Sequence, residues 1–460
     1  MTKISFPETA LALFITMAAC GHGGARENTA FEMEWMKAAI SESDKPADPS
    51  PQLADAGEVA TASSEIWEAY RQAALEAGWD KKILPVPEEG IDVAIKENRA
   101  PKIAAGKFEA DGKEMPYVLL RRGEKPEKGW PLFISMHGGG QYGGKEEIGP
   151  HGWEVNSSEW QAQMRLTAGV YKPDGLYLLP RMADDRLGRW WHRHNIEIFE
   201  QAIRKAILLR EVDPNRVYMM GISQGGYGTC HLTPFFADHL AAGGAMAGGM
   251  MTITPNLRNV AFRSDIGEKD TMYDRINLAR KLHASLDGLR SKDEGGYLNV
   301  LAIQEGRGHG IDYSLSPEWL AKQVPTPHPD RVVWECREKA GLYRRDFYWL
   351  SLVKTPEKGH FEIDARLDRE ANAVTITAIK VEPGAAKEDP ETRAPLDADQ
   401  LRVHLADDML DLDKEVTVTL NEKEVFKGEV QRSRGNLRES IWERGDPNFA
   451  FPVKLEFPKK

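Results

Sequence analysis

VYMMGISQGGYG, residues 217–228, sets a serine between two glycines directly after a run of apolar residues. The apolar part predicts a buried strand, and the small residues that follow Ser223 can open a helix. The flanking Gly221 and Gly225 permit a turn sharp enough to expose the serine hydroxyl at the end of the strand. The stretch therefore predicts that Ser223 is a nucleophile. The alternatives are an ordinary glycine-rich turn between a strand and a helix, or a phosphate-binding loop, although the lysine that such a loop needs is missing.

Short apolar runs on both sides of this stretch predict a sheet whose strands are buried on both faces. The runs cover residues 117–120, 132–136, 176–179, 217–220, 241–247 and 298–303. Ile196, Phe199 and Ile203 recur at intervals of three or four residues, which predicts an amphipathic helix over 195–210. Strands alternating with helices are typical of an α/β domain with a doubly wound, mainly parallel sheet, and the serine turn indicates the α/β-hydrolase version of that fold.

A glycine run, Gly138 to Gly140, follows His137 and the apolar run 132–136. Hydrolases of this fold place half of the oxyanion hole in that position, because glycine N–H groups can approach a substrate carbonyl closely. We predict that the N–H groups of Gly138, Gly139 and Gln224 bind the oxyanion. A merely flexible turn is the alternative.

An acid and a histidine must follow the serine in chain order. Asp270 ends the segment GEKD, and His309 lies in GRGHG after the apolar run 298–303. We predict that His309 acts as general base and that Asp270 orients it. Asp265 is the rival acid, although it falls on or near a strand, and a surface position is the alternative for His309.

Aromatic residues near these motifs are candidates for the substrate cleft. We predict that Trp190 and Trp191 line it together with His137 and Tyr142, with packing in the core as the alternative for the two tryptophans. Cys230 is expected to be a buried thiol rather than a nucleophile.

His192 and His194 form a His-x-His pair, which can bind zinc, and two possible further ligands, Asp184 and Asp185, stand just upstream. No further histidine or cysteine cluster completes such a site in the sequence, so we expect no metal.

Bulk composition indicates a globular chain of 460 residues, with 41% hydrophobic and 28% charged residues. Its formal net charge of −11 argues against a nucleic-acid groove, so no nucleic-acid partner is expected. Cys20, Cys230 and Cys336 are too few for a disulfide framework.

The chain order suggests four segments. Lys3 and the apolar run 10–19 before Cys20 resemble a bacterial export signal, so residues 1–20 predict export to the periplasm, to the outer membrane through a lipid on Cys20, or out of the cell. An uncleaved N-terminus is the alternative. We then expect a linker over 21–60 and a catalytic domain over 61–328, which begins with a helical extension between Ser63-Ser64 and Gly78. Alternating patterns such as FEIDARL predict a β-sandwich-like, all-β domain over 329–460.

Three segments resemble the α/β-hydrolase esterases grouped with dienelactone hydrolases, feruloyl esterases and polyhydroxybutyrate depolymerases, which are often labelled predicted peptidases. They are PLFISMHGGG at 131–140, VDPNRVYMMGISQGGYG at 212–228 and EGRGHG at 305–310, and the resemblance covers about residues 100–325. It implies hydrolysis through an acyl-serine intermediate without metal or organic cofactor. Dienelactone hydrolases carry cysteine where this chain has Ser223, so the ester-hydrolysing branches are closer. The segments RVVW at 331–334 and FYWL at 347–350 resemble a β-rich extension of some secreted bacterial members.

These observations predict a carboxylic-ester hydrolase that acts on a small-molecule or polymeric ester. A prolyl-oligopeptidase-type serine peptidase is one alternative, but roughly 100 residues before the catalytic domain cannot build the large propeller usual there. A non-catalytic polymer-binding protein on a hydrolase scaffold is the other. The natural substrate and the oligomeric state stay open.

Overall fold

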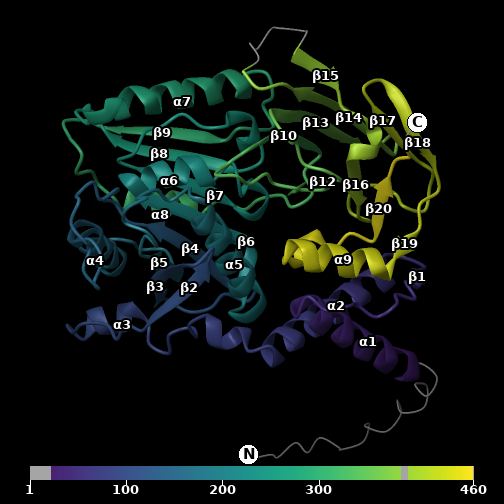
Figure 1. Ribbon diagram of the computed structural model, residues 1–460, viewed down its shortest axis with the longest axis horizontal. Helices are drawn as coiled ribbons and strands as arrows, with labels where there is room; N and C mark the ends of the chain where they lie inside the picture. The colour runs from purple at the N-terminus through teal and green to yellow at the C-terminus, as the bar shows by residue number, and fades with distance from the viewer. Residues whose placement is uncertain (1–21, 385–391, 459–460) are drawn as a thin grey trace, which may run out of the picture.

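The protein is described by a computed structural model over residues 22–384 and 392–458 (Figure 1). The segment expected to be an export signal, 1–20 with Cys20, lies outside these residues. Among the helices of the described ranges, none is long and apolar enough to cross a membrane.

An eight-stranded sheet forms the centre of the first part of the chain, with strand order β2-β3-β5-β4-β6-β7-β8-β9. The pairs β2/β3 and β3/β5 are antiparallel, and the pairs from β5 to β9 are parallel. The strands are β2 (Ala105–Ala110), β3 (Lys113–Arg122), β4 (Trp130–Met136), β5 (Gly175–Pro180), β6 (Val212–Ile222), β7 (Ala242–Met246), β8 (Ala261–Gly267) and β9 (Asn299–Gln304). This mainly parallel sheet, wound on both sides by helices, confirms the predicted α/β-hydrolase fold.

Helices cover both faces of the sheet, because successive side chains of a strand point to opposite faces. On β4, Leu132 and Ile134 belong to the core that contains α5, whereas Phe133 stacks on Tyr177 and Tyr218 in a second core. The helices are α3 (Ile91–Lys96), α4 (Glu154–Gly169), α5 (Arg193–Leu209), α6 (Gln224–Leu232), α7 (Arg275–Arg290) and α8 (Leu315–Leu320). The helix predicted over 195–210 is α5 within two residues at each end.

Two further sheets occupy the last third of the chain. One has the order β10-β13-β14-β17-β18 with β15 beside β14, and the other has the order β11-β12-β16-β20. Along β13, Phe361, Ile363 and Ala365 are buried in alternation, as the sequence pattern predicted. The strands are β10 (Arg331–Arg337), β11 (Asp346–Phe347), β12 (Leu350–Leu352), β13 (His360–Asp368), β14 (Ala373–Val381), β15 (Arg393–Pro395), β16 (Leu401–Leu405), β17 (Val416–Leu420), β18 (Lys423–Gly428), β19 (Arg432–Ser433) and β20 (Val453–Glu456). The region also contains a helix, α9 (Arg434–Arg444), so it is β-rich rather than all-β.

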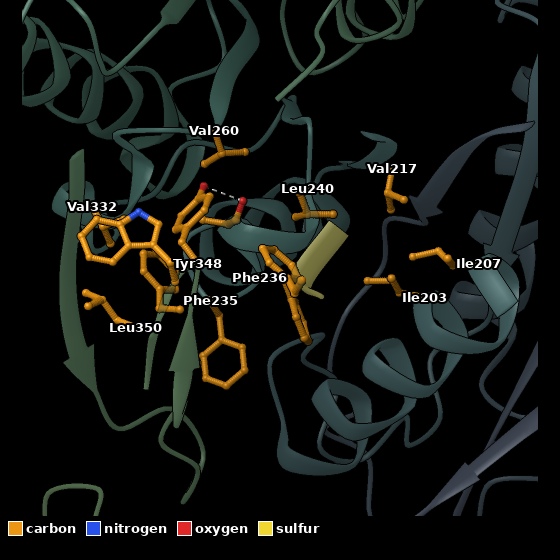
Figure 2. Packing of buried hydrophobic residues seen from close by; sticks show 14 of the residues in the cluster. Ile203, Ile207, Val217, Phe235, Phe236, Leu240, Val260, Val332, Tyr348 and Leu350 are labelled. Carbon is orange, nitrogen blue, oxygen red and sulfur yellow. Dashed lines mark hydrogen bonds between the residues drawn. The ribbon is translucent and has the colours of Figure 1, made fainter. Parts of the chain in front are cut away.

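A continuous apolar core joins the two parts of the chain. Figure 2 shows Val332, Tyr348 and Leu350 from the β-rich region beside Phe235 and Phe236 from the hydrolase region. The Tyr348 hydroxyl donates a hydrogen bond to the Ala237 carbonyl over 2.9 Å. The β-rich sheets therefore pack directly against the hydrolase part.

The prediction of a linker over 21–60 is wrong, because helix α1 (His22–Ile40) and the start of helix α2 (Ala56–Glu76) occupy much of this segment. Helix α1 buries Trp35 and Met36, and its Glu32 accepts hydrogen bonds from two arginines of α9. Helix α2 begins well before Ser63-Ser64, because the Asp55 side chain accepts from the N–H groups of Gly57 and Glu58 and caps it. Strand β1 (Gln52–Leu53) pairs with β19, so α1, α2 and β1 lie beside the yellow C-terminal elements in Figure 1.

Candidate active site

The turn between β6 and α6 holds Ser223 in a strained backbone conformation, with φ 55° and ψ −110°. A Cβ atom on Gly225 would lie 2.2 Å from the Met136 carbonyl oxygen, and one on Gly221 would lie 2.4 Å from the Gly225 carbonyl. Only glycine fits at either position. The Ser223 N–H donates to the Met246 carbonyl over 2.9 Å, which anchors the turn to β7.

Three side chains predicted from separate segments meet at the carboxyl end of the parallel strands. Nε2 of His309 lies 3.1 Å from Oγ of Ser223, and Nδ1 of His309 lies 2.7 Å from Oδ2 of Asp270. Ser223 follows β6, Asp270 follows β8 and His309 follows β9. With Nδ1–H donating to the carboxylate, Nε2 is free to accept the serine proton.

A buried arginine that the sequence analysis missed holds the second oxygen of Asp270. Nη1 of Arg275 donates to Oδ1 of Asp270 over 2.9 Å, and Nε of Arg275 donates to the Tyr227 hydroxyl over 2.7 Å. Arg275 opens helix α7, only five residues after Asp270. The carboxylate is therefore fixed from both sides.

The rival acid, Asp265, lies elsewhere. It is fully buried on β8, where both of its carboxylate oxygens accept hydrogen bonds from Arg263 over 2.7 Å. Burial raises the pKa of Asp265, against the opposing effect of Arg263. The structure thus places Asp270, and not Asp265, against His309.

The buried side chain of His137 holds the glycine loop, residues 138–140, in place. Its Nε2 accepts the Met182 N–H over 3.0 Å, so Nδ1 carries the proton and donates to the Gly138 carbonyl over 2.6 Å. Burial lowers the pKa of His137 to about 3, which keeps the ring neutral. Since the C=O and N–H of one trans peptide point in opposite directions, the Gly139 N–H points away from His137.

Gly140 is held by a side chain that no sequence motif indicated. Asn156, buried on α4, accepts the Gly140 N–H at Oδ1 over 2.9 Å and donates to the Gly140 carbonyl from Nδ2 over 3.0 Å. Nδ2 of Asn156 also donates to Asp185 over 2.6 Å, and Arg181 pairs with the same carboxylate. Burial alone would raise the pKa of Asp185, but hydrogen bonds from Arg181 and Asn156 outweigh it, and the pKa is lowered.

A cleft of about 540 Å³ opens in front of these groups. Ser223, Gln224, Gly139 and Gly140 line it, and its other lining residues include Trp153, Trp191, Tyr227, Tyr273, Arg189 and Arg275. It combines a reactive hydroxyl, backbone N–H groups, aromatic rings and cationic side chains.

Three of the four predicted cleft residues do not line it. His137 and Trp190 are fully buried, and Nε1 of Trp190 donates to the His137 carbonyl over 3.2 Å. These polar atoms find partners behind the glycine loop, so both rings support the site without lining it. Trp191 does line the cleft, whereas Tyr142 is outside the lining and packs on Trp153 at 5.7 Å between ring centroids.

The His-x-His pair has other neighbours. The rings of His192 and His194 stack at 6.0 Å between centroids, and Asp184 pairs with Lys113 over 2.7 Å. Across residues 22–384 and 392–458, the structure holds no group of three or more His, Cys, Asp or Glu side chains placed to bind a metal ion. Cys230 is buried, and burial raises the pKa of its thiol to about 12, which removes it as a nucleophile at neutral pH.

Comparison with known proteins gave matches only among solved structures, since neither family models nor curated proteins matched the chain. One similar structure is a thermostable esterase at 22% sequence identity and TM-score 0.35, which matches 48% of this chain. The match spans 63% of that esterase, less than two thirds of its length. Another is a mutant feruloyl esterase module from Clostridium thermocellum complexed with sinapinate, at 14% identity and TM-score 0.31, covering 52% of this chain and 92% of that one. Esterase 2 of Thermogutta terrifontis, phosphorylated by paraoxon, matches at 14% identity and TM-score 0.33, covering 48% of this chain and 91% of that one.

Proposed function

We propose that this chain is a serine hydrolase that cleaves carboxylic esters through an acyl-enzyme intermediate. The observation that carries the proposal is the unbroken sequence of hydrogen bonds from Ser223 through His309 to Asp270, over 3.1 Å and 2.7 Å. In this order the hydroxyl is the nucleophile and the imidazole is the base that takes its proton. The carboxylate stabilises the imidazolium that forms.

The reaction follows from the positions of these groups. Nε2 of His309 takes the hydroxyl proton as Oγ of Ser223 attacks the ester carbonyl carbon. The tetrahedral oxyanion then collapses, and the alcohol leaves with the proton that His309 returns. Water, deprotonated by His309, attacks the acyl-serine ester, which releases the acid and restores the Ser223 hydroxyl.

Backbone donors of residues that line the cleft would stabilise the oxyanion. Gly139 and Gln224 both line the cleft beside Ser223, and Gln224 is the first residue of α6, where helix N–H groups have no partner within the helix. His137 and Asn156 hold the glycine loop in place through Gly138 and Gly140. These proton and charge carriers belong to the chain itself, so the proposed reaction requires no cofactor.

The chain offers a matched control for a test of this function. Ser264 also pairs with a histidine, because its Oγ lies 2.8 Å from Nε2 of His283, but both side chains are buried away from the cleft. Among the described residues, a serine hydrogen-bonded to histidine is therefore present at the cleft and also in the core, where Ser351 and His404 form a further such pair over 2.7 Å.

Ser223→Ala and Ser264→Ala should be assayed with 4-nitrophenyl acetate and butyrate, and labelled with a fluorophosphonate probe. We expect Ser223→Ala to lose about 10³-fold or more in kcat and all labelling, while folded Ser264→Ala retains both. Near wild-type turnover by Ser223→Ala would refute the proposal. A blocked dipeptide amide run in parallel distinguishes ester from peptide hydrolysis, since faster amide turnover would make the chain a peptidase.

A further inference from the structure

The cleft is cationic, although the whole chain carries a formal net charge of −11. Arg189 and Arg275 both line it, and its lining residues include neither aspartate nor glutamate. Such a local excess of positive charge in a concave site attracts anions.

The two arginines differ in their partners. Arg275 is neutralised by Asp270, as described above. Among the described residues, Arg189 donates from Nη1 to two neutral acceptors, the Gly188 carbonyl at 3.0 Å and Oε1 of Gln224 at 3.4 Å. Within the part of the chain that the structure describes, Arg189 has no carboxylate in ion-pair distance. A half-buried cation without a counter-charge loses hydration that an incoming anion could replace.

The Arg189 guanidinium lies beside the proposed oxyanion hole. Gly188 packs so closely on the glycine loop that a Cβ atom on it would lie 2.1 Å from Cα of Gln141. A Cβ atom on Gly140 would lie 3.6 Å from Nη1 of Arg189. The Arg189 carbonyl accepts a hydrogen bond from Asn195 over 2.9 Å, which fixes the backbone at this point.

A second observation at the same place is independent of charge. Gln224 is 5% exposed, and its Nε2 is buried with no hydrogen-bond partner among the described residues. Its Oε1 accepts a hydrogen bond from Arg189, and Gln224 is among the residues that line the cleft, so a side chain at the cleft holds an amide donor without an acceptor. A buried donor left unpaired destabilises the protein, and an acceptor on a ligand would remove that cost.

One carboxylate, that of Glu159, lies close to the glycine loop. A Cβ atom on Gly138 would lie 2.6 Å from Oε2 of Glu159, but Glu159 is outside the cleft lining. The negative charge of Glu159 therefore does not occupy the position that Arg189 faces.

We infer that the cleft selects esters that also carry a free carboxylate, which Arg189 binds with the Gln224 amide as a second donor. This inference rests on the proposed ester hydrolysis and adds its substrate class. Trp153, Trp191 and Tyr273 supply apolar walls for the body of such a substrate.

Two matched pairs of substrates test the inference. The first pair carries the charge on the acyl side: 4-nitrophenyl hemisuccinate and its methyl-capped diester. The second carries it on the alcohol side: 4-acetoxybenzoate and its methyl ester. The quantity measured is the ratio of kcat/KM for the anionic ester to kcat/KM for its neutral partner.

We expect Arg189→Gln to lower this ratio about 10- to 100-fold in at least one pair, the size of a hydrogen bond to a charged group, and Arg189→Lys to restore part of it. The substrate pair whose ratio falls shows whether the bound carboxylate belongs to the acyl side or the alcohol side of the ester. Arg186→Gln is the control, because Arg186 lies on the same loop but donates to the Gly144 and Glu146 carbonyls outside the cleft. An unchanged ratio in both pairs, or an equal loss on anionic and neutral esters, would overturn the inference.

A binding measurement separates this inference from the proposed function. Ser223→Ala protein is titrated calorimetrically with phenylacetate and with phenylacetamide, so no turnover is needed. Tighter binding of phenylacetate that disappears in the Ser223→Ala, Arg189→Gln double variant supports the carboxylate site even where ester hydrolysis fails. Equal binding of the two compounds excludes it.

Discussion

Nη1 of Arg275 lies 2.9 Å from Oδ1 of Asp270, on the carboxylate oxygen that His309 does not use. Arg275 is buried, and its Nε donates to the Tyr227 hydroxyl, so the arginine is itself held in place. A carboxylate gripped at both oxygens cannot rotate, and its fixed orientation determines where the His309 ring points.

Arg275→Gln should therefore lower kcat by up to about 100-fold, since a misplaced carboxylate costs alignment of the base. Arg275→Lys keeps the charge but loses the paired donors of the guanidinium, so its kcat should lie between those of Arg275→Gln and the wild type. The measurement is kcat and KM for a neutral aryl ester across pH. A change in KM alone, with kcat and its pH profile intact, would show that Arg275 only lines the cleft.

Asn156→Ala should lower kcat by about 10-fold or more, because Gly140 loses both hydrogen bonds that hold the glycine loop. The exposed Gln161 on the same helix is the matched control, and Gln161→Ala should leave kcat unchanged. Steady-state kinetics on folded protein decides. Equal kcat in both variants would remove Asn156 from the support of the oxyanion hole.

Glu32→Gln should reduce the free energy of unfolding by about 3–5 kcal/mol, because fully buried Glu32 is the partner of Arg434 and Arg438 across 2.8 Å and 2.6 Å. The surface pair Lys37–Glu76 lies on the same N-terminal helices with side chains 48% and 58% exposed. Glu76→Gln should cost about 1 kcal/mol at most. Equilibrium denaturation in urea gives both values, and equal losses would mean that α1 is not locked to α9.

The pH dependence of stability should reflect His404, which is buried in the β-rich region. Burial first, and then the charge of Arg444, lowers its pKa to about 3. In the unfolded chain a histidine takes up its proton near pH 6.5. Between these values the unfolded state binds more protons, so stability is complete above about pH 6.5 and falls as the pH drops towards 3.

His404→Gln should therefore show a smaller fall in melting temperature between pH 7.5 and pH 5 than the wild type. The exposed His151 is the control, and His151→Gln should keep the wild-type slope. Identical slopes in His404→Gln and wild type would show that this histidine does not contribute.

Local sequence patterns predicted the site residues that lie directly after a strand. Ser223 was recognisable from its glycines and the preceding apolar run, and Asp270 and His309 from loops that follow strands. Asn156 and Arg189 carry no such signal, because they lie on a helix and in a loop with no motif and reach the site only through the fold. Likewise, the sequence predicted a linker where helix α1 lies. The arginines that pair with Glu32 of this helix follow some 400 residues later in the chain, so local patterns do not reveal them.

The sequence by itself determined the sheet, its crossover helix and the turn at Ser223, since hydrophobic periodicity and the need for glycine act between neighbours in the chain. Only the tertiary structure decided which acid faces His309 and which tryptophan lines the cleft. It also decided that Arg189 meets the Gln224 amide beside the glycine loop. Those choices depend on distances between segments far apart in sequence, and such distances exist only once the strands have been ordered in the sheet and the helices packed on its two faces.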